Sequence, residues 1–384
     1  MNSDSGSGAD FKAERPNTIY QEEKSRFLPI LAGLVAVVAA VGYGGYYFYT
    51  NSEAFNPYKK VYERLGISIP REFERFGQAA RYLDQVKREP CDSVAFTSLT
   101  ELMEKAGFPR ESAMSLEAFS NECTQSDEML RSAFNAYTRV GDHKAAIRVA
   151  DALVKYDTAS KDYRFWRGQA HERAKEYKAA LADYMSSLQL FPDLSNVALS
   201  QFYYVSLMYD KIGKSCEAIA PLETYLSFNV QKRQTAQISQ LISEYSRKGS
   251  CAATYANGSA RIIIPPNNRI DVMINGSPAR MILDTGATSI AITPEMAARA
   301  RIAPDSSNLV EVKVVGGLMQ QATGYAQSVK VGDATAANVP LLIAVGSKDA
   351  FGSETDGLLG MSFLSRYSLT LSSGLLELKQ KARN

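Results

Sequence analysis

Hydrophobic residues recur along this chain in three successive patterns, and each pattern predicts a different kind of structure. A continuous uncharged run covers residues 27 to 49. From residue 55 to residue 250 the apolar positions follow a helical period, with almost no strand-like alternation. From residue 258 to residue 384, short apolar runs are separated by turn dipeptides, which is typical of β-structure. We therefore expect a multidomain chain with an N-terminal transmembrane helix, an all-α region and a C-terminal all-β domain.

The uncharged run is long enough to cross a membrane, because its 23 residues span a hydrocarbon core about 30 Å thick with some tilt. Lys24 and Arg26 directly precede the run, whereas the first cation after it is Lys59, which favours a cytoplasmic N-terminus. A cleaved signal peptide is the alternative, with small residues near Ala39. The 26 residues before the run, and its continuation past that position, argue against cleavage.

The residues before and after this run indicate the compartment in which each part of the chain lies. Residues 1 to 26 are polar and predict a short disordered cytoplasmic tail. All four cysteines then lie outside the cytoplasm, where an even number predicts two disulfides. Pairing by neighbourhood joins Cys91 with Cys123 and Cys216 with Cys251; four buried free thiols are the alternative.

Charge and histidine content narrow the function classes. The chain has 43 basic and 41 acidic residues, a net charge of +2, so nothing favours a nucleic-acid partner. The two histidines, His143 and His171, lie within helical periods, and no C-x-x-C occurs. We therefore expect no metal site and no cofactor.

A repeat is visible within the helical region. Residues 137 to 158 align with residues 171 to 193 at an offset of 34, and a third copy covers residues 209 to 229. This period, with small residues where the helices cross, is the tetratricopeptide pattern, which we assign to residues 131 to 250. Residues 50 to 130 are expected to be helical but irregular. The characteristic positions of the middle copy hold Gly168, Tyr177, Ala180, Tyr184 and Pro192.

Stacked helix pairs of this kind leave a concave surface. One interpretation is a groove that binds a peptide or a protein partner. The other is a spacer that holds the C-terminal domain away from the membrane. No side-chain pattern in the sequence decides between them.

Within the β domain, residues 258 to 384, the clearest hairpin signal is the Asn-Gly turn at residues 275 and 276. Helices are expected only over residues 294 to 301 and 362 to 367. Next to the hairpin, the run ILDTGATSIAI breaks at Asp284 and resumes at once. A turn in an ordinary β-sandwich is one explanation, since Asp and Gly suit turns.

The run resembles the catalytic loop of retropepsin-type aspartic proteases. Two more segments agree with this resemblance. "DGLLG" fits the segment that crosses beneath that loop, and residues 312 to 327 fit a flap hairpin. The crossing segment is Gly357, Leu358, Leu359 and Gly360, and the flap tip holds Gly316, Gly317, Leu318 and Met319. With its anchor and repeats, the chain resembles membrane-anchored bacterial aspartic proteases, which implies a single pass through the inner membrane with periplasmic C-terminal domains.

The resemblance also implies a role for each loop residue. Asp284 is one of two aspartates that share a proton and activate water for peptide hydrolysis. Thr285 hydrogen-bonds to a partner loop, Gly286 lets backbone approach the carboxylates, and Ala287 keeps the adjacent subsite small.

The second aspartate is expected from another chain. No second Asp-Thr-Gly occurs, and a two-lobed enzyme needs about twice this domain's length. A C2 homodimer through the protease domain follows. Asp356 is the nearest rival within the chain, but it matches the crossing segment. The flap has no clear aromatic clamp: Leu318, Met319 and Tyr325 are available, and for Leu318 and Met319 simple packing at a hairpin end is the alternative.

These features predict a membrane-tethered aspartic endopeptidase that cuts exported or membrane proteins, with a substrate or regulator held by the repeats. One alternative is a non-catalytic scaffold that uses a retropepsin-like domain for dimerisation. Another is a regulatory adaptor whose cleft binds a small peptide.

Overall fold

The computed structural model describes residues 20–51, 56–123, 126–251, 255–314, 317–346 and 350–381. The chain forms two compact units, Met1–Leu102 and Met103–Asn384, and the boundary falls inside helix α4 (Ser93–Lys105).

The first unit begins with the long helix α1 (Tyr20–Asn51). Its segment Leu31–Phe48 has a mean hydropathy of 1.6, so the helix is long and apolar enough to cross a membrane. Because α1 starts at Tyr20, the end of the predicted disordered tail is helical, and residues 1–19 lie outside the described part. Three short helices follow, α2 (Lys59–Leu65), η2 (Arg71–Arg75) and α3 (Ala79–Arg88).

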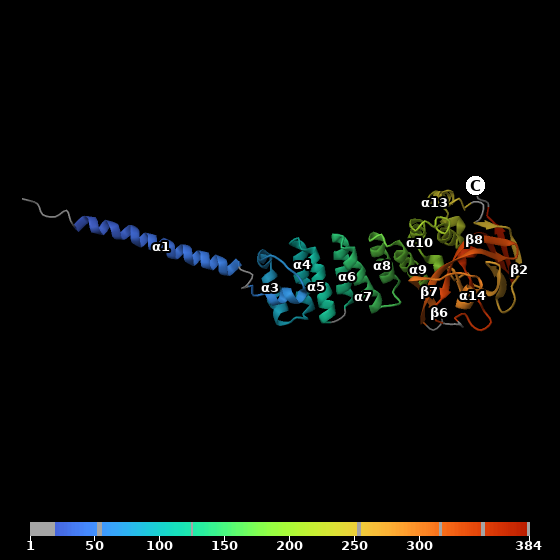
Figure 1. Cartoon of the computed structure of the whole chain (residues 1–384), viewed down its shortest axis with the longest axis horizontal. Helices are drawn as coiled ribbons and strands as arrows, with labels where there is room; N and C mark the ends of the chain where they lie inside the picture. Colours follow the sequence, from blue (N-terminus) through green and yellow to red (C-terminus); the bar gives the residue numbers. More distant parts are fainter. Residues whose placement is uncertain are drawn as a thin grey trace, which may run out of the picture. The chain divides into compact units, whose positions relative to one another are not determined.

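The second unit starts with a series of antiparallel helix pairs, which confirms the tetratricopeptide-like prediction (Figure 1). Where α8 and α9 cross, a Cβ atom on Gly168 would lie 2.9 Å from the Tyr184 ring, so only glycine fits. The helices are α5 (Pro109–Glu122), α6 (Asp127–Val140), α7 (His143–Tyr156), α8 (Lys161–Arg173), α9 (Tyr177–Gln189), η3 (Leu194–Asn196), α10 (Leu199–Lys211), α11 (Ile219–Ser227), α12 (Val230–Arg233) and α13 (Ala236–Gly249).

The C-terminal part of this unit is the predicted β domain. An eight-stranded sheet has the order β1-β8-β5-β9-β4-β3-β7-β6, and an additional β8–β7 pairing curls it towards a barrel. A separate sheet has the order β10-β11-β2. The elements are β1 (Ala256–Asn257), β2 (Ala260–Ile263), β3 (Arg269–Ile274), β4 (Ser277–Leu283), β5 (Ile290–Ile292), α14 (Pro294–Arg299), β6 (Asp305–Val314), β7 (Gly317–Val331), β8 (Ala334–Ala344), β9 (Gly357–Leu359), α15 (Met361–Leu364), β10 (Tyr367–Ser372) and β11 (Leu375–Gln380).

The Asn-Gly hairpin forms as expected. Ile274 pairs with Ser277, and the two residues between them, Asn275 and Gly276, have φ angles of 49° and 77°. Positive φ at both positions is the type I′ turn, whose twist matches that of the flanking strands. The turn therefore fixes the register of β4, the strand that leads into Asp284.

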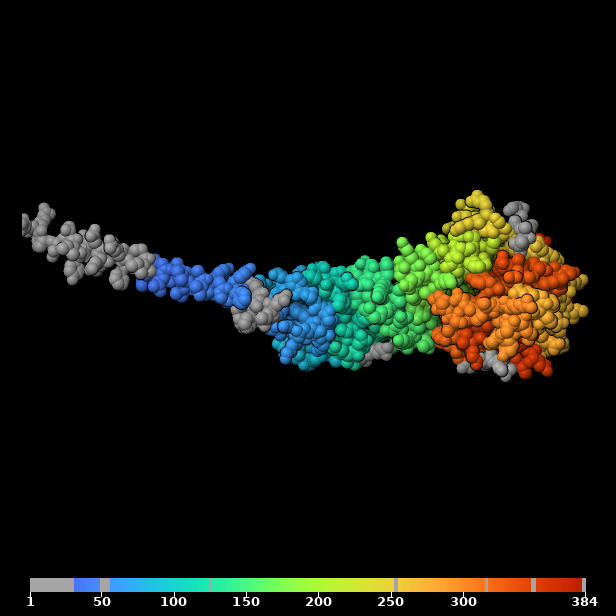
Figure 2. All heavy atoms as spheres, in the orientation of Figure 1, coloured from blue at the N-terminus to red at the C-terminus, as the bar shows by residue number. Residues whose placement is uncertain are grey.

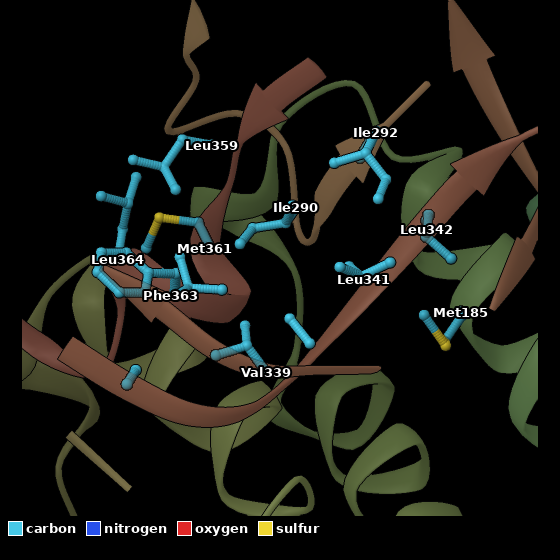
Figure 3. Packing of buried hydrophobic residues seen from close by; sticks show 14 of the residues in the cluster. Met185, Ile290, Ile292, Val339, Leu341, Leu342, Leu359, Met361, Phe363 and Leu364 are labelled. Carbon is cyan, nitrogen blue, oxygen red and sulfur yellow. The ribbon is translucent and has the colours of Figure 1, made fainter. Parts of the chain in front are cut away.

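One hydrophobic core extends from the last repeats into the β domain. Figure 3 shows Met185 of α9 pointing towards the strand that carries Leu341 and Leu342. On the other side of this cluster lie Leu359 of β9 and Phe363 of α15. The change from helical to strand-like hydrophobic periodicity near residue 250 therefore separates two kinds of secondary structure within one compact unit.

A disulfide joins Cys216, before α11, to Cys251, after α13, with Cα atoms 5.7 Å apart. It ties the two ends of the last helical segment together just before the chain enters the β domain. Cys91 and Cys123 are also disulfide-bonded, so neither thiol is free.

Candidate active site

Asp284 lies directly after β4, where the loop turns back on itself. Its main-chain N–H donates to the carbonyl of Leu359 at 3.1 Å. Its Oδ1 accepts hydrogen bonds from the N–H groups of Gly286 at 2.8 Å and Ala287 at 3.2 Å. The side chain is half-buried, whereas Thr285 and Gly286 are exposed. The loop thus orients a carboxylate at the surface by backbone donors, without a cationic partner among the described residues.

Gly286 has a steric role within this loop. A Cβ atom at this position would lie 3.2 Å from Oδ1 of Asp284, tighter than an ordinary contact. The N–H of Gly286 reaches the carboxylate because no side chain intervenes.

The crossing segment holds the loop from beneath. Strand β9 runs parallel to β4 and antiparallel to β5, so it fills the gap between the two strands that flank the loop. A Cβ atom on Gly360 would lie 2.2 Å from the carbonyl oxygen of Ser289, and one on Gly357 would lie 2.0 Å from that of Ala291. The N–H of Met361 donates to the Ala287 carbonyl at 2.8 Å. Backbone contact this close requires glycine at both ends of the segment.

Asp356 lies at the other end of β9 and is held by structural contacts. Its Oδ2 accepts from the N–H of Arg280 at 2.8 Å, and its Oδ1 pairs with the Arg299 guanidinium. Because β9 runs beside β4, Asp356 lies level with Arg280, four residues before Asp284, or roughly 13 Å away at about 3.3 Å per residue. The two carboxylates within one chain are therefore too far apart to share a proton. The chain's Asp-Ser-Gly, at residues 4 to 6, precedes α1 and lies outside the described residues.

The flap region is a hairpin of β6 and β7, with Val314 paired to Gly317. Gly316 lies outside the described residues. Leu318 is 37% exposed and Met319 half-buried at this end of the hairpin. Tyr325 lies elsewhere: Lys214 Nζ sits 4.5 Å from the centre of its ring, in the contact with the repeats. Leu318 and Met319 therefore remain as residues near the flap tip, and Tyr325 does not.

Helix α8 contacts the flap strand β6, and α9 contacts both β6 and the catalytic loop. In Figure 2 the last repeats adjoin the β domain. Arg164 of α8 forms an ion pair with Glu311 of β6, and Ser186 Oγ of α9 accepts from the Glu311 N–H at 2.9 Å. Gln189, the last residue of α9, donates its side-chain amide to Thr288 Oγ1. No local sequence pattern pointed to these residues.

Two hollows adjoin the loop. A small cavity of about 30 Å³ lies beneath Thr288 and Ser289, against α9, α10 and α11. A groove of about 1290 Å³ has Thr285 in its lining, together with residues of β10 on one side and of α11 to α13 on the other. Among the described residues, no cluster of three or more His, Cys, Asp or Glu side chains could hold a metal ion.

Comparison with known proteins gives matches for both parts of the second unit. Residues 270–366 match the model of the family described as "gag-polyprotein putative aspartyl protease". An uncharacterised protein in the cobV 5′ region of Sinorhizobium sp. is 36% identical over 93 residues, which is 24% of this chain and 38% of that protein. The chain thus matches well under half the length of this relative.

Two solved structures are also similar in part. A retropepsin-like aspartic protease from Rickettsia conorii is 25% identical, covering 32% of this chain and 99% of its own, with a TM-score of 0.26. YrrB, a tetratricopeptide repeat protein with an unusual peptide-binding site, is 13% identical, covering 50% of this chain and 98% of its own, with a TM-score of 0.34. The chain combines a tetratricopeptide-like helical region with a retropepsin-like domain.

Proposed function

We propose that this chain is an aspartic endopeptidase, with Asp284 as its catalytic carboxylate. The observation that carries the proposal is the loop geometry. A surface carboxylate is oriented by two backbone N–H groups, directly above a glycine-bounded crossing strand. This loop belongs to a segment that matches an aspartyl protease family.

The chemistry requires a second carboxylate, which we assign to Asp284 of a second copy. In the C2 dimer the two carboxylates share one proton. The ionised member takes a proton from a bound water, which attacks the peptide carbonyl, while the protonated member hydrogen-bonds to the carbonyl oxygen. One proton of the pair then passes to the leaving amine as the C–N bond breaks, and the other stays shared between the two carboxylates. The exposed Thr285 and Gly286 leave room for a second loop to approach.

We further place the enzyme on the periplasmic side of the bacterial inner membrane, anchored by α1. The apolar segment Leu31–Phe48 and the absence of free cysteines among the described residues support an anchored, exported protein. Confinement to a membrane raises the effective concentration of the chains and favours their pairing. The substrates are then segments of exported or membrane proteins.

The test uses the full chain in detergent micelles, incubated with a peptide library and with EDTA. Asp284→Asn should lower cleavage by about 10³-fold or more, because a paired-aspartate mechanism fails without its carboxylate. Asp271→Asn is the matched control: it makes the same change at an exposed position of β3 and should leave the rate unchanged. Cleavage that survives Asp284→Asn would remove the assignment. Absence of cleavage by a confirmed wild-type dimer would instead favour the scaffold interpretation.

A further inference from the structure

The groove beside the catalytic loop has two unlike walls. One wall is the edge strand β10, which among the described strands pairs only with β11, so its other edge is open. Tyr367, Ser368 and Leu369 of this strand line the groove. The other wall is the end of the helical region, from α11 to α13. Thr285, the residue after the catalytic aspartate, also lines this groove.

The helical wall offers small and apolar side chains to this space. Helix α13 presents Ser239, Ser243 and Ser246 to the groove, at the four- and three-residue spacing of one helix face, and Ser250, which directly follows the helix, also lines it. Leu226, Phe228 and Val230 add apolar surface, and Val230 is 50% exposed. Small side chains let another chain approach the helix closely, and their hydroxyls supply hydrogen-bond partners.

The catalytic requirement identifies what fills the groove. Two Asp284 carboxylates that share a proton lie about 3 Å apart, so the two-fold axis passes close to them. Thr285 is one residue away, about 3.8 Å along the backbone. A surface that adjoins Thr285 therefore faces the second copy, and the site stays incomplete until that copy arrives. In an isologous contact each copy offers its own open β10 edge at this axis.

We propose that this groove is the seat of a second copy of the chain, so that α13 of the helical region forms part of the interface that completes the active site. The proposal rests on the proposed function, because it takes the position of the two-fold axis from the paired aspartates. It assigns the repeats a direct part in assembly, in addition to their contact with the flap.

The test is a pair of substitutions on α13 in the full chain, in detergent. Ser239→Arg places a long cation in the groove, where Arg247 and Lys381 already line the wall. Gln240→Arg is the matched control: it adds the same side chain at the next position, which is also exposed and is not among the residues that line the groove. Sedimentation velocity should give a dimer dissociation constant at least tenfold higher for Ser239→Arg and within twofold of wild type for Gln240→Arg.

A photo-crosslinking amino acid provides an independent measurement with little change to the protein. Placed at Ser243, which lines the groove, it should join two differently tagged copies; placed at Glu244, it should not. Asp284→Asn should abolish cleavage and leave the dimer dissociation constant and the crosslink unchanged. Failure of the proposed catalytic role can therefore be distinguished from failure of the proposed interface. Unchanged self-association in Ser239→Arg would overturn the proposal. A raised KM with unchanged association would show that the groove holds substrate, and a chain that stays monomeric while cleaving would also overturn it.

Discussion

The ion pair between Arg164 and Glu311 joins the helical region to the flap strand, and its loss should weaken the whole second unit. The Arg164 side chain is 1% exposed and that of Glu311 is 23% exposed. Burial lowers the pKa of Arg164, with Glu311 opposing this effect, but guanidinium stays charged in proteins. Glu311→Gln therefore removes the charge that pairs with this buried cation and leaves neutral acceptors, the new amide oxygen and the Thr158 carbonyl, as its hydrogen-bond partners.

The magnitude follows from the burial. Removing one partner of a buried pair costs about 3 to 5 kcal/mol. Because Glu311 is partly exposed, water offsets some of this, and we expect about 2 to 3 kcal/mol. In a unit of this size that lowers Tm by roughly 4 to 8 °C. The N–H of Glu311 still donates to Ser186 in the variant, so the substitution isolates the charge.

The assay is thermal and urea unfolding of the full chain, followed by fluorescence. The single tryptophan, Trp166, lies on α8 two residues from Arg164 and stacks on Phe134 with ring centres 5.8 Å apart. Lys178→Gln is the control, because Lys178 joins α9 to Asp305 of the same strand through a pair whose side chains are 64% and 42% exposed. This exposed pair should contribute under about 1 kcal/mol.

Two results would refute the reasoning. A Glu311→Gln variant within about 0.5 kcal/mol of wild type would mean that the buried cation finds another partner. The double variant Arg164→Met with Glu311→Leu should regain most of the lost stability, since removing both charges removes the unpaired ion. If the losses of unfolding free energy in the two single variants simply add in the double variant, Arg164 and Glu311 do not form a specific pair.

Three further predictions concern the loop, the disulfide and a buried acid. Gly360→Ala should cost about 3 kcal/mol or more and abolish cleavage, seen by near-UV circular dichroism and peptide assay, because its Cβ would lie 2.2 Å from the Ser289 carbonyl oxygen. Replacing Cys216 and Cys251 by serine should lower the urea-derived stability by about 3 to 4 kcal/mol, since their bond closes a 35-residue separation. Burial raises the pKa of Glu217, so unfolding free energy should fall as pH rises from about 4.3 through that raised value. Urea midpoints between about pH 4 and 8 should lose this slope in Glu217→Gln.

Local patterns predicted the local structure well. The Asn275-Gly276 turn and the helix from Pro294 follow from backbone preferences that a few neighbouring residues express, and both are present. The tight position of Gly168 against Tyr184 follows from the repeat period in the same way. The helix expected over 362 to 367 is shorter, Met361–Leu364, because the chain turns into β10 at Tyr367.

The contacts between the repeats and the β domain could not be predicted from such patterns. Gln189 and Thr288 are 99 residues apart, and Arg164 and Glu311 are 147 apart. A helical or strand period describes which face of an element is apolar, and says nothing of which distant element covers that face. Tyr325 is an example: the hairpin sequence made it a candidate for the substrate clamp, whereas packing sets its ring beside Lys214.

These contacts also bear on the two interpretations of the repeats, as a partner-binding groove or as a spacer. A spacer needs no specific bond to the domain it carries, yet α8 and α9 bond directly to the flap strand and to the catalytic loop. A binding groove that is open along the whole length of the repeats is also inconsistent with the structure, since α9 packs against β6. We therefore expect a regulator of the repeats to act without entering the cleft. Arg164 of α8 and Ser186 of α9 both bind Glu311 of the flap strand. A displacement of α8 relative to α9 would therefore move the flap strand with the helices.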